Sequence, residues 1–156
     1  MKKAKVTYRG WPGHFICGER CVFHLNTLVE LGEIRIVIST VGMMKNWHAP
    51  NAFNATEYEE IGCERYYETM SFAAIRRGEF YDADVHRQVQ FEAPWSYGSI
   101  ADEWKANKGH WNVVNEIVDK METGQPIFDM EGSAITSTNK RVTARKPRPK
   151  SPKATS

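Results

Sequence analysis

Apolar and polar residues alternate along two segments in the first third of the chain, and this pattern predicts two β-strands joined in a hairpin. The odd positions of residues 21–29 form a mostly apolar face. Residues 33–41 are rich in β-branched side chains, which favour strands. Gly32 lies between the two segments and is typical of a turn. Residues 5–9 alternate more weakly and predict one further short strand.

Residues 64–92 predict a second hairpin, with Arg77 and Gly78 at its tip. In this register Glu68 lies opposite Arg87, and the ion pair between them interrupts an otherwise apolar face. The other face is polar along both strands, so we expect it to be exposed to solvent. It carries Arg65, Tyr67, Thr69 and Ser71 on the first strand, and Asp84, His86, Gln88 and Gln90 on the second.

One apolar stripe at helical spacing predicts a long helix over residues 99–123. The stripe consists of Ile100, Trp104, Trp111, Val114, Val118 and Met121. Ser99 is a typical N-cap residue, and Gly124 is typical of the position that ends a helix. We expect the stripe to pack against the sheet.

These elements define an α+β fold, an antiparallel sheet of about five strands packed by one long C-terminal helix. Residues 1–135 are long enough to form a single domain with its own core. Residues 43–60 show no sustained period and predict a long surface loop, of the kind that often carries contact residues. Apolar residues become scarce over residues 136–156, so this tail is predicted to be disordered.

A formal net charge of +2 conceals an acidic body and a basic tail. Residues 1–139 carry 14 basic and 19 acidic groups, a net of −5. The tail carries basic side chains and no acidic ones, namely Lys140, Arg141, Arg145, Lys146, Arg148, Lys150 and Lys153. Its Ser-Pro-Lys and Arg-Pro steps resemble those of linker-histone tails. Such a segment is expected either to contact nucleic acid or another anionic partner, or only to keep the chain in solution.

Cysteine content and hydropathy indicate the compartment. The chain contains three cysteines, an odd number that is too small for a disulfide-rich secreted scaffold. No run of about eighteen apolar residues could span a bilayer, and the first residues do not form the apolar block of a signal peptide. We therefore expect a cytoplasmic protein without a membrane partner.

Residues 14–24 hold the densest group of chemically active side chains. His14, Cys17 and Cys21, together with His24, could surround one zinc ion, because imidazole and thiolate are the ligands of tetrahedral zinc sites. The spacing is not that of a standard zinc knuckle, and strand alternation turns His24 away from Cys21. The alternative is that no cofactor binds, with Cys21 in the core and Cys17 as a small apolar filler.

A second candidate site lies on the predicted polar face of the second hairpin. Asp82, Asp84 and His86 alternate along one strand and could together bind a divalent metal or perform acid–base chemistry. The same alternation continues through Gln88 and Gln90, as expected of a solvated sheet face. A zinc-stabilised or metal-dependent hydrolase that uses one of these two groups is the alternative to a non-enzymatic function.

Two further catalytic functions, a cysteine nucleophile and an ADP-ribosyltransferase-like site, have little support in the sequence. No family-specific signature surrounds any of the cysteines, so a cysteine nucleophile is not indicated. Arg9, Ser39-Thr40 and Glu92 resemble the Arg, Ser-Thr and Glu elements of the ADP-ribosyltransferases, and the resemblance covers only these positions. The sequence contains neither a Gly-rich phosphate loop nor a helix-turn-helix pair.

Several short motifs resemble those of small accessory proteins encoded by phages and prophages. They are Gly10-Trp11-x-Gly13-His14-Phe15-Ile16-Cys17, Ser39-Thr40-Val41-Gly42-Met43, Arg65-Tyr66-Tyr67-Glu68-Thr69-Met70 and Asp82-Ala83-Asp84-Val85. The resemblance implies a protein that binds and modulates, or inhibits, a host macromolecular machine such as a defence or nucleic-acid-handling complex. We therefore expect a non-enzymatic binding protein. Its predicted partner surface consists of Tyr67, Asp82, Asp84, His86 and Gln88, with Trp47 and His48 from the long loop.

Overall fold

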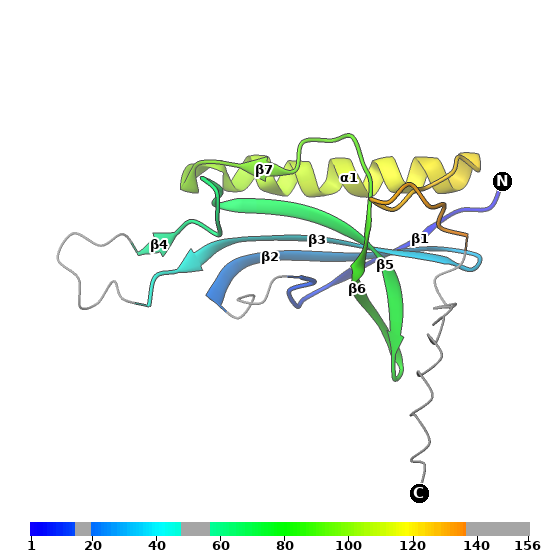
Figure 1. The fold of residues 1–156 in the computed structure, drawn as a ribbon, viewed down its shortest axis with the longest axis horizontal. Helices are drawn as coiled ribbons and strands as arrows, with labels where there is room; N and C mark the ends of the chain where they lie inside the picture. Colours follow the sequence, from blue (N-terminus) through cyan, green and yellow to red (C-terminus); the bar gives the residue numbers. More distant parts are fainter. Residues whose placement is uncertain (15–19, 48–56, 137–156) are drawn as a thin grey trace, which may run out of the picture.

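The computed structural model describes residues 1–14, 20–47 and 57–136, which form one antiparallel sheet with a single long helix on one face (Figure 1). The five main strands are β1 (Lys5–Arg9), β2 (Cys21–Leu31), β3 (Ile34–Lys45), β5 (Tyr67–Arg77) and β6 (Phe80–Val89), in the order β1-β2-β3-β5-β6. Two short strands, β4 (Tyr58–Glu59) and β7 (Ser96–Tyr97), pair with β3 and β5. The 3-10 turn η3 (Ile100–Asp102) leads into helix α1 (Glu103–Thr123). The predicted α+β class is confirmed.

The first hairpin forms as the alternation predicts. β2 and β3 pair along nearly their whole length, and Gly32 occupies the turn with a φ of 59°, which glycine adopts readily. β3 continues to Lys45, so the first residues of the predicted 43–60 loop belong to the sheet. The predicted strand at residues 5–9 is β1, which pairs with the outer side of β2.

The second hairpin also forms, but its register differs from the predicted one. The turn consists of Gly78 and Glu79, one residue later than expected. Pairing then shifts between Phe72 and Ala74, and this bulge places residues 84–87 of β6 opposite a single residue of β5. The bulge adds three residues to β6. Because this number is odd, the side chains of β6 change faces relative to β5 across the bulge, and one register cannot describe the whole hairpin.

The face of β5 that was predicted to be exposed is buried. Tyr67, Thr69 and Ser71 are at most 1 % exposed. The Tyr67 hydroxyl donates to the carbonyl oxygen of Ile100 at 2.6 Å, at the start of the helical segment, and burial raises the pKa of Tyr67 to about 12. Glu68, on the opposite face of the strand, is also buried. β5 is therefore an inner strand that is covered on both sides.

The helix forms where predicted but buries a different stripe. Trp104 is 65 % exposed and Ile100 is 39 % exposed, so their predicted place in the core is wrong. The buried residues are Ala106, Gly109, His110, Val113, Val114, Ile117 and Met121. Small residues at 106 and 109 allow the first half of α1 to approach the sheet more closely than a tryptophan would. Among the described helices, none is long and apolar enough to cross a membrane.

His110 is fully buried between α1 and the sheet. Its two ring nitrogens each lie 2.8 Å from a threonine hydroxyl, that of Thr27 on β2 and that of Thr40 on β3. The Thr40 hydroxyl lies 2.7 Å from that of Thr69 on β5. Burial lowers the pKa of His110 to about 4, so the imidazole is neutral at pH 7. A neutral histidine thus ties the helix to three strands.

The segment after the helix returns along the end of β6 and closes the core. Asp129 forms an isolated bridge with Val89. Ile127 and Ile135 are each 3 % exposed and pack in the cluster between the sheet and α1. The packed part of the chain therefore extends at least to Ile135, close to the predicted domain end. The predicted disordered tail lies outside the described residues from residue 137 onward.

Changing Gly42 to Ala should destabilise the fold. Gly42 lies on β3 directly opposite Tyr67, and an added Cβ would come within 2.6 Å of the Tyr66 carbonyl oxygen and would overlap the Tyr67 ring. Because backbone and a fully buried ring must then shift, we expect a loss of about 1–3 kcal/mol in the free energy of unfolding, measured by urea denaturation. Gly10→Ala is the matched control, since nothing lies within 4 Å of its added Cβ. Equal stability of the two variants would contradict the packing described.

Stability should fall between pH 6.5 and pH 4 because His110 stays neutral in the folded chain. The unfolded state binds a proton near pH 6.5, whereas the folded state does so near pH 4. Above pH 6.5 the neutral His110 therefore costs no stability. At pH 4 the difference of 2.5 pKa units between the two states lowers the free energy of unfolding by about 3 kcal/mol. When the free energy of unfolding is measured by urea denaturation across this range, it should fall less steeply with decreasing pH in His110→Gln than in the wild type. The exposed His86→Gln should keep the wild-type slope, and an unchanged slope in both variants would refute the assignment.

Candidate functional site

The segment after β1 crosses the face of the sheet opposite α1 (Figure 1). The N–H of Gly13 donates to Ser39 Oγ on β3 at 3.1 Å. A side chain at position 13 would not fit, because its Cβ would lie 2.7 Å from the Cβ and Oγ of Ser39. His24 on β2 lies with Nε2 3.0 Å from the carbonyl oxygen of Gly10. Residues 10–14 therefore lie directly on β2 and β3.

Three polar side chains form a row across the strands under this segment. Arg9, Asn26 and Ser39 occupy directly paired positions on β1, β2 and β3. The Arg9 guanidinium donates to Asn26 Oδ1 from Nε at 3.1 Å and from Nη2 at 2.8 Å, and its Nη1 donates to the carbonyl oxygen of Tyr81. The Trp11 ring covers this guanidinium, 4.8 Å from its carbon. All three residues of the row are buried, so the row belongs to the interior.

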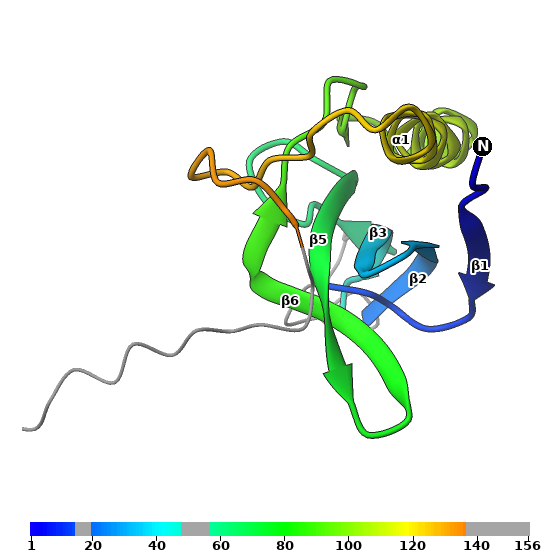
Figure 2. The same ribbon diagram turned by 90° about the vertical axis from the view of Figure 1, so that its right-hand side faces the viewer.

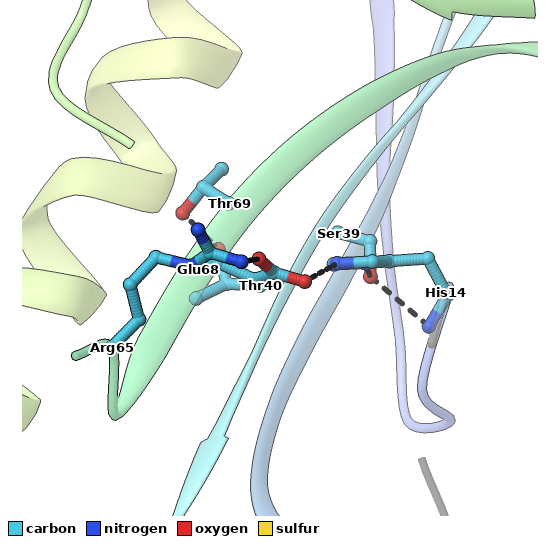
Figure 3. A network of polar contacts seen from close by, with 7 residues as sticks. His14, Ser39, Thr40, Arg65, Glu68 and Thr69 are labelled. Atoms are coloured by element: carbon cyan, nitrogen blue, oxygen red, sulfur yellow. Dashed lines mark hydrogen bonds and ion pairs between the residues drawn. The ribbon is translucent and has the colours of Figure 1, made fainter. Parts of the chain in front are cut away.

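His14 joins this row to β5. Its Nδ1 lies 2.7 Å from Ser39 Oγ, and its Nε2 lies 3.2 Å from Glu68 Oε1 (Figure 3). Arg65 Nη2 lies 3.2 Å from the other carboxylate oxygen, Glu68 Oε2. The predicted ion pair between Glu68 and Arg87 is therefore wrong, because both oxygens of Glu68 have other partners.

The hydrogen bond between His14 and Glu68 has a defined direction. Burial alone would raise the pKa of Glu68, but the hydrogen bond from His14 and the positive charge of Arg65 lower it overall. The carboxylate is thus the acceptor, and His14 Nε2 carries the hydrogen that it accepts. Ser39 Oγ can donate its own hydrogen to Nδ1 while it accepts the N–H of Gly13.

A hydrogen-bonded line of serine, histidine and glutamate can relay a proton, but here it fastens one segment to the sheet. Ser39 is fully buried, and His14 is 8 % exposed. While residues 10–14 lie in place, no substrate can reach the Ser39 hydroxyl. We call Ser39, His14 and Glu68 the His14 clamp.

The residues that resemble elements of the ADP-ribosyltransferases do not form one site. Arg9 and Ser39 share the polar row. Thr40 faces the helix, where it bonds to His110. Glu92 lies beside α1, where its N–H donates to a helix carboxylate. Arg9 and Ser39 therefore lie together, whereas Thr40 and Glu92 lie on the helix side of the sheet.

Three members of the predicted zinc set are described, His14, Cys21 and His24, and all three are engaged with protein groups; His24 Nε2 lies 3.0 Å from the carbonyl oxygen of Gly10. Both ring nitrogens of His14 belong to the clamp. Cys21 packs in an apolar cluster with Val41, Met44 and Ile61, as expected of a core residue. Cys17 lies outside the described residues. Within the ranges that the structure describes, no three His, Cys, Asp or Glu side chains lie close enough together to hold a metal ion.

Asp82, Asp84 and His86 do not share one face, contrary to the prediction, because the bulge at residues 84–87 breaks the alternation. Asp84 is buried, and its Oδ1 accepts the N–H of His86 at 3.2 Å in a local turn. Asp82 accepts the N–H of Ala83 at 2.8 Å. His86 is exposed. The strand therefore does not present the predicted set of three aligned ligands.

A cleft of about 460 Å³ opens where the His14 clamp reaches Glu68. The guanidinium carbon of Arg65 lies 5.2 Å from the ring centroid of Trp95, and both residues line the cleft. Arg65 Nε is buried and has no hydrogen-bond partner among the described residues. The other lining residues are Thr69, Met70, Gln88, Val89, Gln90, Phe91 and Met130. Half of the ten lining residues are polar or charged and half are apolar, so the cleft can contact both kinds of group.

A second pocket, of about 400 Å³, adjoins this cleft and extends along β6. The two cavities share Gln88 and Met130. The second pocket is further lined by Val85, His86, Arg87, Asp129 and Glu131. Exposed apolar side chains lie on both: Val85 is 58 % exposed, Trp95 45 % and Met130 59 %. We call the lining residues of the two cavities together the β6 surface.

Only part of the predicted partner surface lies on the β6 surface. His86 and Gln88 line it. The assignment of Tyr67 to an exposed face is wrong, since its side chain is fully buried. Trp47 is exposed but lines neither cavity. His48 and the seven basic residues predicted to bind nucleic acid lie outside the described residues.

Sequence reasoning missed Arg65, Glu68 and Trp95 as site residues. They converge only through tertiary contacts, and His14 lies 54 positions before Glu68. No spacing rule relates residues that far apart. The one signal in the sequence was the charge of Glu68 within an otherwise apolar strand face, since a buried charge requires partners.

Comparisons with known proteins identify no family. Nothing matches this chain among protein-family models, curated protein sequences or solved structures. The class of the protein therefore rests on its geometry, an antiparallel sheet covered by one helix. Its function is inferred from the cavities and contacts described above.

Changing Glu68 to Gln should loosen the segment that the His14 clamp fastens. The amide is isosteric but uncharged, so Arg65 loses its ion pair and His14 loses a charged acceptor. We expect a loss of about 1–3 kcal/mol in the free energy of unfolding at pH 7 and faster hydrogen exchange in residues 10–14. Glu79→Gln, at the exposed hairpin tip, should change neither quantity. Unaltered exchange in Glu68→Gln would show that the clamp does not fasten the segment.

Proposed function

We propose that this protein is a non-enzymatic binding protein and that its partner is another protein, which docks on the β6 surface. The observation that carries the proposal is the pair of adjoining cavities that share Gln88 and Met130 and expose apolar side chains. Exposed apolar side chains that gather around a concave surface are typical of protein interaction sites.

The composition of the β6 surface supports a protein partner. Tryptophan, arginine and methionine are enriched in the central parts of interfaces, and Trp95, Arg65 and Met130 all line the cleft. The Trp95 ring already lies against the Arg65 guanidinium, so both side chains are ordered before a partner arrives. Preorganised anchors reduce the entropy that binding costs.

Charge in the cleft limits the kind of group that enters it. Arg65 and Glu68 neutralise each other at 3.2 Å, so the cleft presents little net charge there. Gln88 and Gln90 supply amide groups. The amide nitrogen of Gln90 already donates to the Asp129 carbonyl at 2.6 Å, which leaves its oxygen as an acceptor. The partner would therefore insert an uncharged side chain that combines apolar surface with a hydrogen-bonding end.

The wider role follows from the resemblance to accessory proteins of phages. We take the partner to be a component of a host macromolecular machine, which this protein would bind and modulate in the cytoplasm. The basic tail residues from Lys140 to Lys153 would add a contact to an anionic partner such as nucleic acid. The tail contact would be sensitive to salt, whereas docking on the β6 surface would depend on apolar burial.

Substitutions on the β6 surface should weaken partner binding. In the full chain, Trp95→Ala should reduce the affinity by about 2 kcal/mol, roughly thirtyfold, because it removes the aromatic anchor of the cleft. A photo-crosslinking residue at position 130 should give an adduct with one host protein, identified by mass spectrometry, and Trp95→Ala should suppress that adduct.

The matched control for this experiment is Trp47→Ala. Trp47 is more exposed than Trp95 and lines neither cavity of the β6 surface. It should leave the affinity for the crosslinked protein unchanged, and a crosslinker at position 47 should not yield the same adduct. Equal effects of the two substitutions, or no adduct at position 130, would reject the proposed surface.

A further inference from the structure

β1 is an edge strand with an open outer side. It pairs with β2 alone, and within the described ranges no other segment covers its outer backbone groups (Figure 2). The unpaired N–H and C=O groups of such an edge can pair with another strand. The strand also exposes two apolar side chains, since Val6 is 44 % and Tyr8 is 55 % exposed.

One side of α1 continues this edge. The ring centroids of Tyr8 and Trp111 lie 6.4 Å apart, and the N–H of Ala4 donates to Glu122 at 2.9 Å. Positions 111 and 122 therefore face β1, and residues at helical spacing from them lie on the same side of the helix. They are Trp104, Lys108, Trp111, Asn115, Val118 and Glu122. We call these residues, together with β1, the β1–α1 surface.

We propose that a second copy of this chain docks on the β1–α1 surface and that the two β1 strands pair antiparallel in a twofold-symmetric dimer. The two sheets would then join into one continuous sheet, with both helices on the same face. A second copy is the occupant because the surface is complementary to itself under a twofold axis, as an isologous interface requires.

The strand is self-complementary in its apolar residues. An antiparallel pairing centred on Thr7 places Val6 of each copy opposite Tyr8 of the other. A β-branched residue opposite an aromatic one is a favourable cross-strand pair, and the symmetry forms this pair twice. Both pairs would lie on the helix side of the sheet, where Tyr8 already contacts Trp111.

This register has one unfavourable like-charge pair, Lys5 opposite Arg9 of the second copy, on the side of the sheet away from the helices. Lys5 Nζ already lies 3.6 Å from a carboxylate oxygen of Glu30. The guanidinium of Arg9 is buried against Asn26 in its own chain. Each of these two cations thus has a partner within its own copy.

The helices are complementary in the same sense. The twofold axis would run the N-terminal half of one α1 alongside the C-terminal half of the other. Trp104 would then lie toward Val118 of the second copy, with Trp111 near the axis beside Tyr8. An exposed aromatic ring meets an aliphatic side chain twice in the dimer. The contact would cover Trp104, the most exposed of the tryptophans on α1.

The dimer is tested with the full chain by sedimentation velocity over a range of concentrations up to several hundred micromolar. The wild type should shift from monomer to dimer as its concentration rises. Val6→Asp should remain monomeric with an unchanged circular dichroism spectrum, because it places two carboxylates in the apolar pairs. Val22→Asp is the matched control, since Val22 is a similarly exposed valine on β2 and belongs to neither proposed surface. It should dimerise as the wild type does.

A second measurement tests the pairing without disturbing the apolar residues. In a chain whose three cysteines are replaced by serine, Thr7→Cys should form a disulfide-linked dimer on mild oxidation, because the axis places the two copies of residue 7 side by side. Glu79→Cys, at the exposed hairpin tip, should not. A wild type that stays monomeric throughout, or a Thr7→Cys chain that does not crosslink, would overturn the proposal. Neither outcome bears on the β6 surface, which lies at the opposite edge of the sheet.

Discussion

The fold depends on how polar side chains are satisfied at the centre of the sheet, where both faces are covered. Neighbouring residues of a strand point to opposite faces, so β3 and β5 each place one buried polar residue on either side: Ser39 and Thr40, Glu68 and Thr69. One histidine serves each face. His110 bonds to Thr40, which bonds to Thr69, while His14 joins Ser39 to Glu68 (Figure 3). Each polar group left without its partner would cost about 1–3 kcal/mol, so the two histidines fix which segments cover the two faces.

These two histidines come from opposite ends of the packed chain, and this has a consequence for the binding site. His14 belongs to the segment after β1, and His110 belongs to the C-terminal helix. Both bond to β3, so the N-terminal segment and the helix are fixed relative to each other through this strand. Glu68 receives His14 on one oxygen and Arg65 on the other, and Arg65 in turn lies against Trp95. The anchors of the β6 surface are thus held by the same contacts that close the core.

The sequence predicted the elements well because alternation and helical spacing are local properties. Both hairpins, the edge strand at residues 5–9 and the helix ending at Gly124 are confirmed. The faces were predicted less well. Polar residues such as Thr69 were taken as exposed, whereas hydroxyl groups can enter the core when a histidine on another element satisfies them. The bulge between Phe72 and Ala74 carries no glycine or proline that would announce it, and it displaced every expectation that rested on the register of β6. The cleft beside Arg65 and Trp95 could not be predicted, because these two residues meet only after the sheet is built.

The arrangement of the two proposed surfaces has a consequence of its own. The β6 surface lies at one edge of the sheet and β1 at the other, so pairing through β1 would leave both copies of the cleft open. A dimer of this kind presents two identical binding surfaces related by the twofold axis. Against a host assembly that itself contains repeated subunits, the second contact becomes intramolecular, and the overall affinity can exceed that of one cleft by several orders of magnitude. A modest interface at each cleft would then suffice for tight binding, provided that the spacing of the target subunits matches the fixed separation set by the joined sheet.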